Sequence, residues 1–294
     1  NALTAQRLKR VPSIINKLKR PYGGRPPTMK LSQMQDIAGC RAVLATVPQV
    51  KKLCQDYLKG NLKHPRAGIK DYISRPKEDG YRSIHIVYKF FSDKRKKIYN
   101  DLLIEIQFRS KLQHYWATAI ETVDFFTRQA IKSNEGQPEW VDFFKLVSSA
   151  FAIMEGCPPV PNITIDENEL YLQIKKKEAE LKVIKIMTGW AKAMNIFDEF
   201  TGSKGRKKTK AQFFLLELDI VGEKMNITAY TKKQEQRAIE NYARAEKRNK
   251  DKKEYDVVLV GVDTVTDLRK AYPNYFVDSK EFLENLRKII AKAN

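Results

Sequence analysis

The chain has 294 residues, enough for two compact units, and its hydrophobic content of 42% is typical of a globular protein rather than a disordered one. Its net charge of +20 is unevenly placed, because the first 35 residues contain many Lys and Arg residues but no Asp or Glu. This asymmetry favours a polyanionic partner such as a nucleotide or a nucleic acid. The basic clusters at 204–210 and 232–253 are equally typical of solvated helices and loops.

The composition also argues against several classes of protein. Three cysteines at irregular positions and three histidines without metal-type spacing disfavour a disulfide framework and a structural zinc site. There is no apolar run of about 18 residues that could span a membrane, and we expect no signal peptide and a cytoplasmic location. The glycine-rich signatures of P-loop ATPases and Rossmann enzymes are absent from the sequence, which disfavours both classes.

The first half of the chain combines strand patterns with helix patterns, which predicts an α+β core with a mixed β-sheet flanked by helices. Pro12 is expected to open a helix at its first turn. The predicted elements, in chain order, are a basic helix at 8–18, a loop at 21–27, a strand at 37–45, a helix at 47–58, strands at 69–73, 83–91 and 102–108, and helices at 110–131 and 140–154.

A proline-rich stretch at 157–161 marks the predicted end of this core. We expect three parts: the core at 1–156, a helical connector with a basic loop at 157–211, and a smaller C-terminal α/β module at 212–294. The elements predicted beyond the core are a long charged helix at 167–196, the basic loop at 202–210, strands at 213–219, 225–230 and 255–260, and helices at 233–248, 263–270 and 280–291.

The strand at 102–109 carries Glu105, Gln107 and Arg109 on one face, because alternate side chains of a strand face opposite sides. The apolar residues between them form the other face. Charged side chains beside a core are rare unless they are paired or used, so this face predicts a functional surface. A second polar string, at 71–85, is expected to form the other wall of a phosphate-handling site.

Asp36 directly precedes the predicted strand at 37–45. Alone it could be a capping residue or half of a surface ion pair. Together with Glu105 it provides one carboxylate on each of two strands, which suits Mg²⁺ when phosphate oxygens and water complete the octahedron. The pair therefore predicts a magnesium site.

Cations of the kind that bind phosphates occur around these acids. Each one alone would be an ordinary surface base, but their occurrence with two placed acids predicts stabilisation of a transferring phosphoryl group. The candidates are Arg7, Lys9, Arg41, Lys77 and Arg109.

Two further residues have two readings each. Tyr81 follows Gly80 in a predicted turn at the rim of the sheet, where its ring could stack on a nucleobase or be a half-buried turn aromatic. His85, on the following strand, could hold a phosphate or be a satisfied core histidine.

These residues, in this order, resemble the synthetase domain of the RelA/SpoT family over about residues 7–121. Asp79 stands where the family more often has Asn. The resemblance implies a nucleotidyltransferase-like fold. The motifs that carry it are Arg7 and Lys9 with Ser13-Ile14, Asp36 with Arg41, Asp71-Tyr72-Ile73, Pro76-Lys77, the run from Gly80 to His85, and the run from Glu105 to Arg109.

The resemblance implies transfer of the β,γ-pyrophosphate of ATP to a ribose 3′-hydroxyl. It implies that Asp36 and Glu105 carry Mg²⁺, with Glu105 also assisting deprotonation of the attacking hydroxyl, and that Tyr81 stacks on the acceptor base. The ATP-binding residues would be Arg7, Lys9, Ser13 and Arg41, and the acceptor-binding residues Lys77, Tyr81, His85, Gln107 and Arg109.

Residues 165–294 resemble the C-terminal region of fused toxin–antitoxin synthetases of the CapRel type. In that group a pseudo-zinc-finger module folds back on the synthetase, and a Tyr-x-x-Tyr segment blocks the nucleotide site. Tyr272 and Tyr275 fit that segment, although they would also fit a turn that packs two aromatic rings. This resemblance implies a self-inhibited enzyme of anti-phage defence that modifies the 3′-CCA end of tRNA and is released by a phage-encoded protein.

The catalytic motifs fit a second acceptor equally well, GDP or GTP, which would make the chain a (p)ppGpp synthetase. An RNA-binding module with a degenerate site is a third reading, which the intact Asp36, Tyr81 and Glu105 disfavour. The sequence leaves the acceptor and the oligomeric state open.

Overall fold

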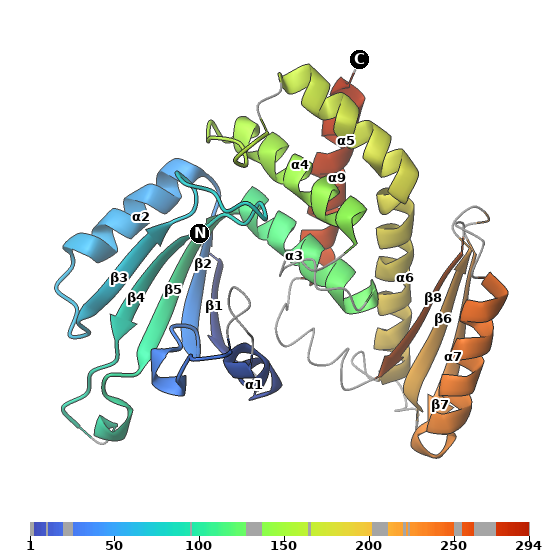
Figure 1. Cartoon of the computed structure of the whole chain (residues 1–294), viewed down its shortest axis with the longest axis horizontal. Coiled ribbons are helices and arrows are strands. Elements are labelled where there is room, and N and C mark those ends of the chain that lie inside the picture. Colours follow the sequence, from blue (N-terminus) through green and yellow to red (C-terminus); the bar gives the residue numbers. More distant parts are fainter. Residues whose placement is uncertain are drawn as a thin grey trace. The chain divides into compact units, whose positions relative to one another are not determined.

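The computed structural model describes residues 3–9, 11–19, 26–94, 96–127, 137–163, 166–201, 211–219, 222, 224–249, 255–261 and 275–293. Packing divides the chain into two compact units (Figure 1). The first unit comprises Asn1–His114 and Ser148–Thr164, and the second comprises Tyr115–Val147 and Ile165–Asn294. The three parts predicted from the sequence, which divide at residues 156 and 211, remain a prediction.

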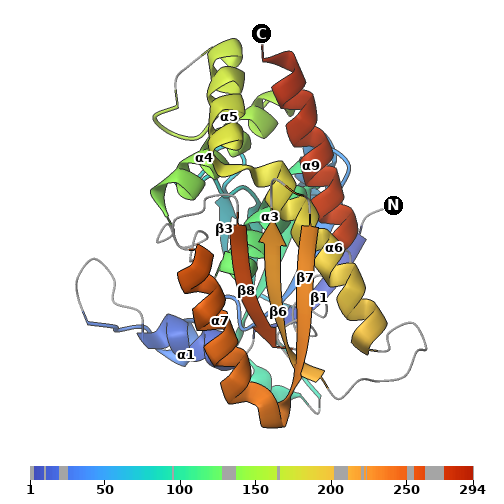
Figure 2. The ribbon, with the colours of Figure 1, turned by 90° about the vertical axis from the view of Figure 1, so that its right-hand side faces the viewer.

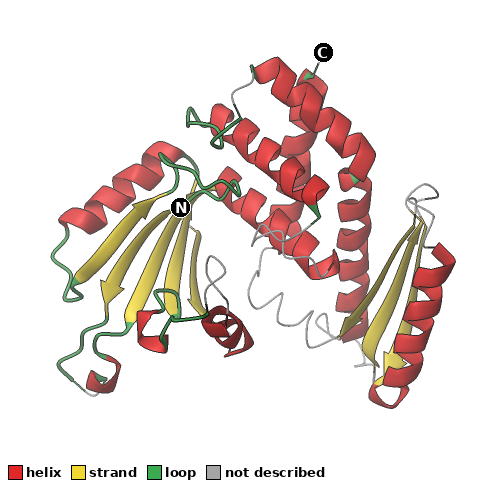
Figure 3. Ribbon diagram, in the orientation of Figure 1, coloured by secondary structure: helices red, strands yellow, loops and turns green. Residues whose placement is uncertain are grey.

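The first unit is built on a five-stranded mixed sheet with the strand order β1-β2-β5-β4-β3. The central strands β2 and β5 are parallel, and the other neighbours are antiparallel (Figure 3). This confirms the predicted α+β class with a mixed sheet. The bounds are β1 Leu3–Leu8, α1 Val11–Lys19, η1 Leu31–Gln33, β2 Ala38–Leu44, α2 Val47–Lys59, β3 Arg66–Asp71, β4 Ile84–Lys89, η2 Lys97–Tyr99 and β5 Leu103–Ser110.

One face of this sheet is apolar and packs against α2. Val50 of α2 and Phe108 of β5 are almost completely buried in this core, and Ile106 packs against it. Because side chains alternate along β5, the residues between these apolar ones face the opposite side of the sheet. The predicted division of this strand into an apolar face and a polar face is confirmed.

Two predicted elements in this unit have wrong boundaries: the helix at 8–18 starts later, and the strand at 69–73 runs instead from Arg66 to Asp71. The helix predicted at 8–18 begins only at Val11, because the preceding residues form β1 and pair along their length with β2. The strand predicted at 69–73 ends at Asp71. There the Asp71 carboxylate accepts hydrogen bonds from the backbone N–H groups of Ile73 and Ser74, which turns the chain out of the sheet.

The helices of the second unit share an aromatic core. The ring of Phe126 stacks on that of Trp190 with centroids 4.7 Å apart, and the Trp116 indole N–H donates to the Phe144 carbonyl oxygen at 2.8 Å. Two of the helices, α3 and α4, begin or end in the first unit. The bounds are α3 Lys111–Thr127, α4 Pro138–Met154, α5 Glu167–Leu181, α6 Val183–Thr201 and α9 Tyr275–Lys292.

The single long helix predicted at 167–196 is wrong, since the chain breaks into α5 and α6 at Lys182. Lys182 has a left-handed backbone with φ of 53°. Glu178 binds both sides of the break. Its carbonyl oxygen accepts from the Lys182 N–H, and its carboxylate accepts from the Ile184 N–H at 3.1 Å. These bonds satisfy backbone groups that the break would otherwise leave unpaired.

A small antiparallel sheet with the order β7-β6-β8 completes the second unit (Figure 2). Leu215 and Tyr230 form a core with Ala238 of α7, whereas Leu218 approaches Gly189 of α6. The predicted order of strand, strand, helix and strand is confirmed, and its pseudo-zinc-finger character remains a prediction. The bounds are β6 Ala211–Asp219, β7 Lys224–Thr231, η4 Lys232–Gln234, α7 Glu235–Asn249 and β8 Tyr255–Gly261.

The predicted helix at 263–270 and the basic loop at 202–210 lie outside the described residues. The helix predicted at 280–291 is confirmed as part of α9. In the described parts of the chain, every helix is too short or too polar to cross a membrane. The cytoplasmic location remains a prediction.

Gly39 allows the two parallel central strands to approach closely. A Cβ atom added at Gly39 would lie 2.5 Å from the Glu105 carbonyl oxygen. We therefore expect Gly39→Ala to lower the free energy of unfolding by about 1–3 kcal/mol, because strand β2 must shift. Gly68→Ala in β3 is the matched control, since its added Cβ would meet nothing within 4 Å. Urea denaturation measures both, and equal effects of the two variants would contradict this role of Gly39.

Candidate active site

The polar face of the first sheet is organised by strand register. His85 of β4 and Arg41 of β2 lie opposite Gln107 from its two sides, and Gly39 lies opposite Glu105. The outer strands extend these rows, because Arg7 of β1 lies opposite Gly39 and Lys70 of β3 lies opposite His85. Residues of β2, β3, β4 and β5 are thus brought to one surface, although they are far apart in sequence.

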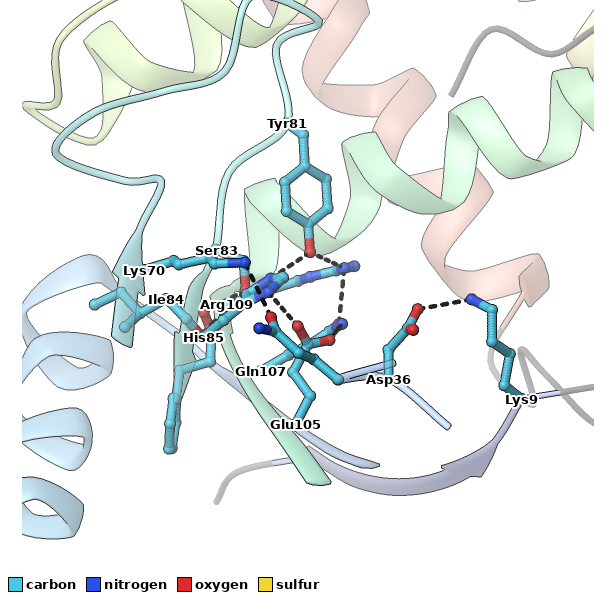
Figure 4. Close-up of polar contacts among 12 residues, drawn as sticks. Lys9, Asp36, Lys70, Tyr81, Ser83, Ile84, His85, Glu105, Gln107 and Arg109 are labelled. Carbon is cyan, nitrogen blue, oxygen red and sulfur yellow. Dashed lines mark hydrogen bonds and ion pairs between the residues drawn. The ribbon is translucent and has the colours of Figure 1, made fainter. Parts of the chain in front are cut away.

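Five side chains on this surface form a closed ring of hydrogen bonds, which we call the polar ring (Figure 4). Arg109 Nη2 donates to the Tyr81 hydroxyl at 2.7 Å and to Gln107 Oε1 at 3.0 Å. Gln107 Nε2 donates to Glu105 Oε2 at 2.6 Å. His85 closes the ring, with Nδ1 2.7 Å from Glu105 Oε1 and Nε2 2.8 Å from the Tyr81 oxygen.

The chemistry of the donors sets the direction of these bonds. Burial lowers the pKa of His85, and the charges of Arg109 and Lys77 lower it further against the opposing effect of Glu105, so the imidazole is neutral at pH 7. Arginine can only donate, so the Tyr81 oxygen accepts from Arg109 and its own proton can go to His85 Nε2. His85 then carries its proton on Nδ1 and donates it to Glu105.

Glu105 is held as an ionised carboxylate inside the protein. Burial raises its pKa, but hydrogen bonds from His85 and Gln107 outweigh burial and bring the pKa below its usual value. The negative charge of Asp36 raises the pKa of Glu105, which means that the two carboxylates lie within electrostatic reach of each other. That the two acids hold one metal ion remains a prediction.

Asp36 lies between two lysines. Lys9 Nζ is 2.7 Å from Oδ2, and Lys17 Nζ is 2.8 Å from Oδ1. Partial burial raises the pKa of Asp36, but the hydrogen bonds and charges of both lysines lower it to about 2. The sequence alone predicts no role for Lys17. Its contact with Asp36 depends on the position of α1 beside the start of β2, which no local sequence pattern shows.

A second group of cations lies over the aromatic rings of the site. Lys77 Nζ is 4.7 Å from the centroid of Tyr72 and 5.3 Å from that of Tyr81, and the guanidinium carbon of Arg109 is 5.0 Å from the Tyr81 centroid. Tyr81 is therefore half-buried between cations. This matches the alternative of a half-buried turn aromatic, and stacking on a base remains a prediction.

Hydrogen bonds from Asp79 and Ser148 hold the turn that carries Tyr81. Gly80 has φ of 87°, and the Asp79 carboxylate accepts from the Tyr81 N–H at 2.8 Å. Ser148 of α4 donates to the Gly80 carbonyl oxygen at 2.6 Å and accepts from Arg82 Nε at 3.1 Å. Sequence reasoning missed Ser148 because it lies more than 60 residues away from the turn, and no local pattern connects the two.

For the remaining predicted site residues, the structure shows either no phosphate contact or only the backbone position. His85 is buried with both ring nitrogens engaged, as expected of a satisfied histidine, and its phosphate-binding role remains a prediction. Arg7 and Ser13 belong to β1 and α1, but their side chains lie outside what the structure describes. Tyr272 lies outside the described residues, and only the backbone of Tyr275, the first residue of α9, is described.

Comparison with known proteins finds similarity in this part of the chain. Residues 6–125 match the sequence model described as the region found in RelA/SpoT proteins. This matched region is less than half of the chain. The region contains Asp36, both of its lysines and the whole polar ring, whereas Ser148 lies beyond it.

Two curated relatives match the same part of the chain. The GTP pyrophosphokinase YjbM of Bacillus subtilis (strain 168) is 31% identical over 121 residues, which are 40% of this chain and 54% of the relative. The GTP pyrophosphokinase YwaC of the same organism is 30% identical over 116 residues, which are 39% of this chain and 54% of the relative. The chain thus spans about half the length of these relatives.

Solved structures are similar over a longer stretch. Small alarmone synthetase 1 from Bacillus subtilis, bound to its product pppGpp, is 27% identical with a TM-score of 0.44, covering 52% of this chain and 74% of that one. A GTP pyrophosphokinase family protein from Streptococcus pneumoniae is 26% identical with a TM-score of 0.42, covering 52% of this chain and 70% of that one.

The hydroxyl group of Tyr81 bonds two members of the polar ring, Arg109 and His85, and the aromatic face of Tyr81 cannot replace these bonds. Tyr81→Phe removes the partner of Arg109 Nη2 and of His85 Nε2, so we expect the free energy of unfolding to fall by about 1–2 kcal/mol. Nitrogen NMR of the three histidines should also show a shift of the His85 Nε2 signal, because this nitrogen loses the hydrogen bond from Tyr81. Tyr72→Phe, the neighbouring aromatic, is the control and should change neither. An unaltered His85 signal in Tyr81→Phe would contradict the ring of bonds.

The ion pairs of Asp36 predict a pH dependence of stability. A carboxylate whose pKa is lowered on folding stabilises the fold above its unfolded value near 4, and this stabilisation is lost as pH falls towards its folded value of about 2. Wild type should exceed Asp36→Asn in unfolding free energy by about 2 kcal/mol at pH 6, and this difference should shrink below pH 4. Urea denaturation at successive pH values measures it.

Asp56→Asn, at an exposed position of α2, serves as the control for this series. It should cost little at pH 6 and should show no such loss between pH 4 and pH 2. If Asp36→Asn behaves like Asp56→Asn, the two lysines do not hold Asp36 as described.

Proposed function

We propose that this chain is an ATP-dependent pyrophosphokinase that transfers the β,γ-pyrophosphate of ATP to a ribose 3′-hydroxyl. The observation that supports the proposal most is the ionised Glu105, held by the polar ring within reach of Asp36 and inside the region that matches RelA/SpoT proteins. The two curated relatives that match this region are named as GTP pyrophosphokinases, which supports the same reaction class.

The residues of the site fit a magnesium ion. Asp36 already attracts two ammonium groups at 2.7 and 2.8 Å, which shows that this carboxylate stabilises positive charge beside it. Carboxylate and phosphate oxygens are the ligands that Mg²⁺ prefers, so Asp36 and Glu105 would hold the ion together with the phosphates of ATP. When bound, Mg²⁺ would neutralise charge on the transferring phosphates.

In the proposed reaction, the ribose 3′-oxygen of the acceptor forms a bond to the β-phosphorus of ATP. The bond between that phosphorus and the oxygen bridging it to the α-phosphate breaks, so AMP leaves. The proton of the 3′-hydroxyl passes to Glu105, which is ionised and therefore able to accept it. Gln107 and His85 keep the Glu105 oxygens in place during this transfer.

The cations divide between the two substrates in this proposal. Lys9 and Lys17 contact Asp36, and Arg41 lies opposite Gln107 on the neighbouring strand. These three cations would bind the phosphates of ATP together with Arg7 and Ser13. Lys77 and Arg109 lie on the side of Tyr81 and would bind the acceptor. Tyr81 would contact the acceptor base through the part of its ring that remains accessible.

The names of the curated relatives favour GTP or GDP as the acceptor, which would make the product (p)ppGpp. A second acceptor is the 3′-CCA end of tRNA, which the acid-free first 35 residues and the net charge of +20 support. In that case the chain would inhibit translation in anti-phage defence, with Tyr272 and Tyr275 blocking the site until a phage-encoded protein binds the C-terminal module.

Labelled ATP tests the reaction and its acceptor together. We expect label from the γ-phosphate to appear in an acceptor when the protein is incubated with GDP, GTP or deacylated tRNA in separate reactions. Glu105→Gln should reduce transfer by at least about 100-fold, because the amide cannot accept the proton. Glu78→Gln, an exposed position in the Tyr81 turn, is the matched control and should retain transfer.

The acceptor that takes up label decides between the two candidates. Labelled guanosine tetra- or pentaphosphate alone would exclude the tRNA candidate, and labelled tRNA alone would exclude the alarmone candidate. Transfer that survives Glu105→Gln at the wild-type rate would contradict the proposed role of Glu105.

A further inference from the structure

The loop between β4 and β5, residues 90–102, exposes apolar side chains that the transfer site does not use. Ile98 is 82% exposed, Tyr99 50% and Phe91 44%. Single apolar side chains at a surface are ordinary, but several on one short loop mark an interaction surface. Figure 3 shows this loop, with its short helix η2, extending beyond the end of the sheet.

Hydrogen bonds hold the loop in this shape. The Asn100 side chain accepts from the Ser92 N–H at 2.7 Å and donates to the Ser92 carbonyl oxygen at 3.1 Å. The base of the loop is closed by the Phe90 N–H, which donates to the Leu102 carbonyl oxygen, and by the Phe91 N–H, which donates to His64 Nδ1. The exposed rings are therefore presented by a loop whose own contacts fix it.

The same loop carries positive charge between its apolar residues. Lys94, Lys96 and Lys97 are all exposed. Asp93, one of the two acids in the loop, lies 3.7 Å from Lys63, which offsets its charge. The surface thus offers aromatic ring faces together with exposed ammonium groups.

We propose that this loop binds single-stranded RNA. Stacking of bases on Tyr99 and Phe91 with contacts from the lysines to phosphates is the combination that proteins use for single strands. Leu102 directly precedes β5 and Asp36 lies two residues before β2, so the loop and Asp36 lie at the same end of these two parallel strands, where Ala38 is opposite Ile104. This proposal goes beyond the proposed function, since binding does not require the RNA to be the acceptor.

RNA suits this surface better than a lipid bilayer does. The exposed apolar residues lie on both sides of the basic run at 94–97, so that charged side chains separate Phe91 from Ile98 and Tyr99 in the sequence. A single strand can place a base on each aromatic ring and a phosphate beside each ammonium group. A flat bilayer would instead contact the apolar and the charged side chains together.

Binding of a fluorescent single-stranded RNA of about 12 nucleotides, measured by anisotropy without ATP, tests the proposal on the full chain. We expect Lys96→Glu with Lys97→Glu to weaken binding at least tenfold. The slope of the logarithm of the binding constant against the logarithm of salt concentration should become shallower by about 0.7 for each phosphate that is no longer neutralised. The matched control is Lys51→Glu with Lys52→Glu, an exposed pair on α2 with the same change in charge, which should weaken binding far less.

The aromatic contribution is tested at Tyr99. Tyr99→Ala should weaken RNA binding at least about fivefold, and Tyr99→Phe should restore wild-type affinity because it keeps the ring. Circular dichroism checks that each variant is folded. Transfer to GDP by the same variants serves as a separate readout, so that failure of the enzyme proposal and failure of RNA binding can be told apart.

Several results would overturn the proposal. Equal weakening in the loop pair and the α2 pair would mean that binding follows net charge alone. Unchanged RNA affinity in Tyr99→Ala, with reduced binding to phosphatidylserine vesicles, would assign the loop to a membrane. A change of oligomeric state in sedimentation, with RNA affinity intact, would assign it to contact between copies of the chain.

Discussion

The arrangement of the site depends on keeping one carboxylate, that of Glu105, ionised while it is buried against a sheet. A buried charge is strongly destabilising unless hydrogen bonds compensate it, and here His85 and Gln107 supply those bonds. Each of these two partners is itself fixed by another member of the polar ring, His85 by Tyr81 and Gln107 by Arg109. Burial of the Glu105 carboxylate therefore requires that each of these neighbouring side chains be held in a defined position.

This requirement connects local turns and distant helices to the same atom. Tyr81 can reach His85 only because Gly80 adopts a positive φ and because Ser148 holds the turn from α4. Gly39 admits the close approach of β2 to the backbone of Glu105 on β5. The two acids are stabilised differently, Glu105 by neutral partners and Arg109 behind them, and Asp36 directly by two lysines.

The sequence was informative where the signal is local and silent where it depends on packing. The period of two along 102–109 predicts the shared face of Glu105, Gln107 and Arg109, which the hydrogen bonds confirm. No local pattern marks β1, which exists because it pairs with β2, or the break at Lys182, which Glu178 stabilises. Lys17 and Ser148 were missed for the same reason, since only the fold brings them to their partners.

The central claim is that Asp36 and Glu105 act as one site for a metal and the phosphates of ATP. Calorimetric titration of Mg²⁺ with a non-hydrolysable ATP analogue tests it most directly. We expect binding of the analogue to the wild type to depend on Mg²⁺. Asp36→Asn and Glu105→Gln should each lose this dependence while remaining folded. Magnesium-dependent binding that is unchanged in both variants would contradict it.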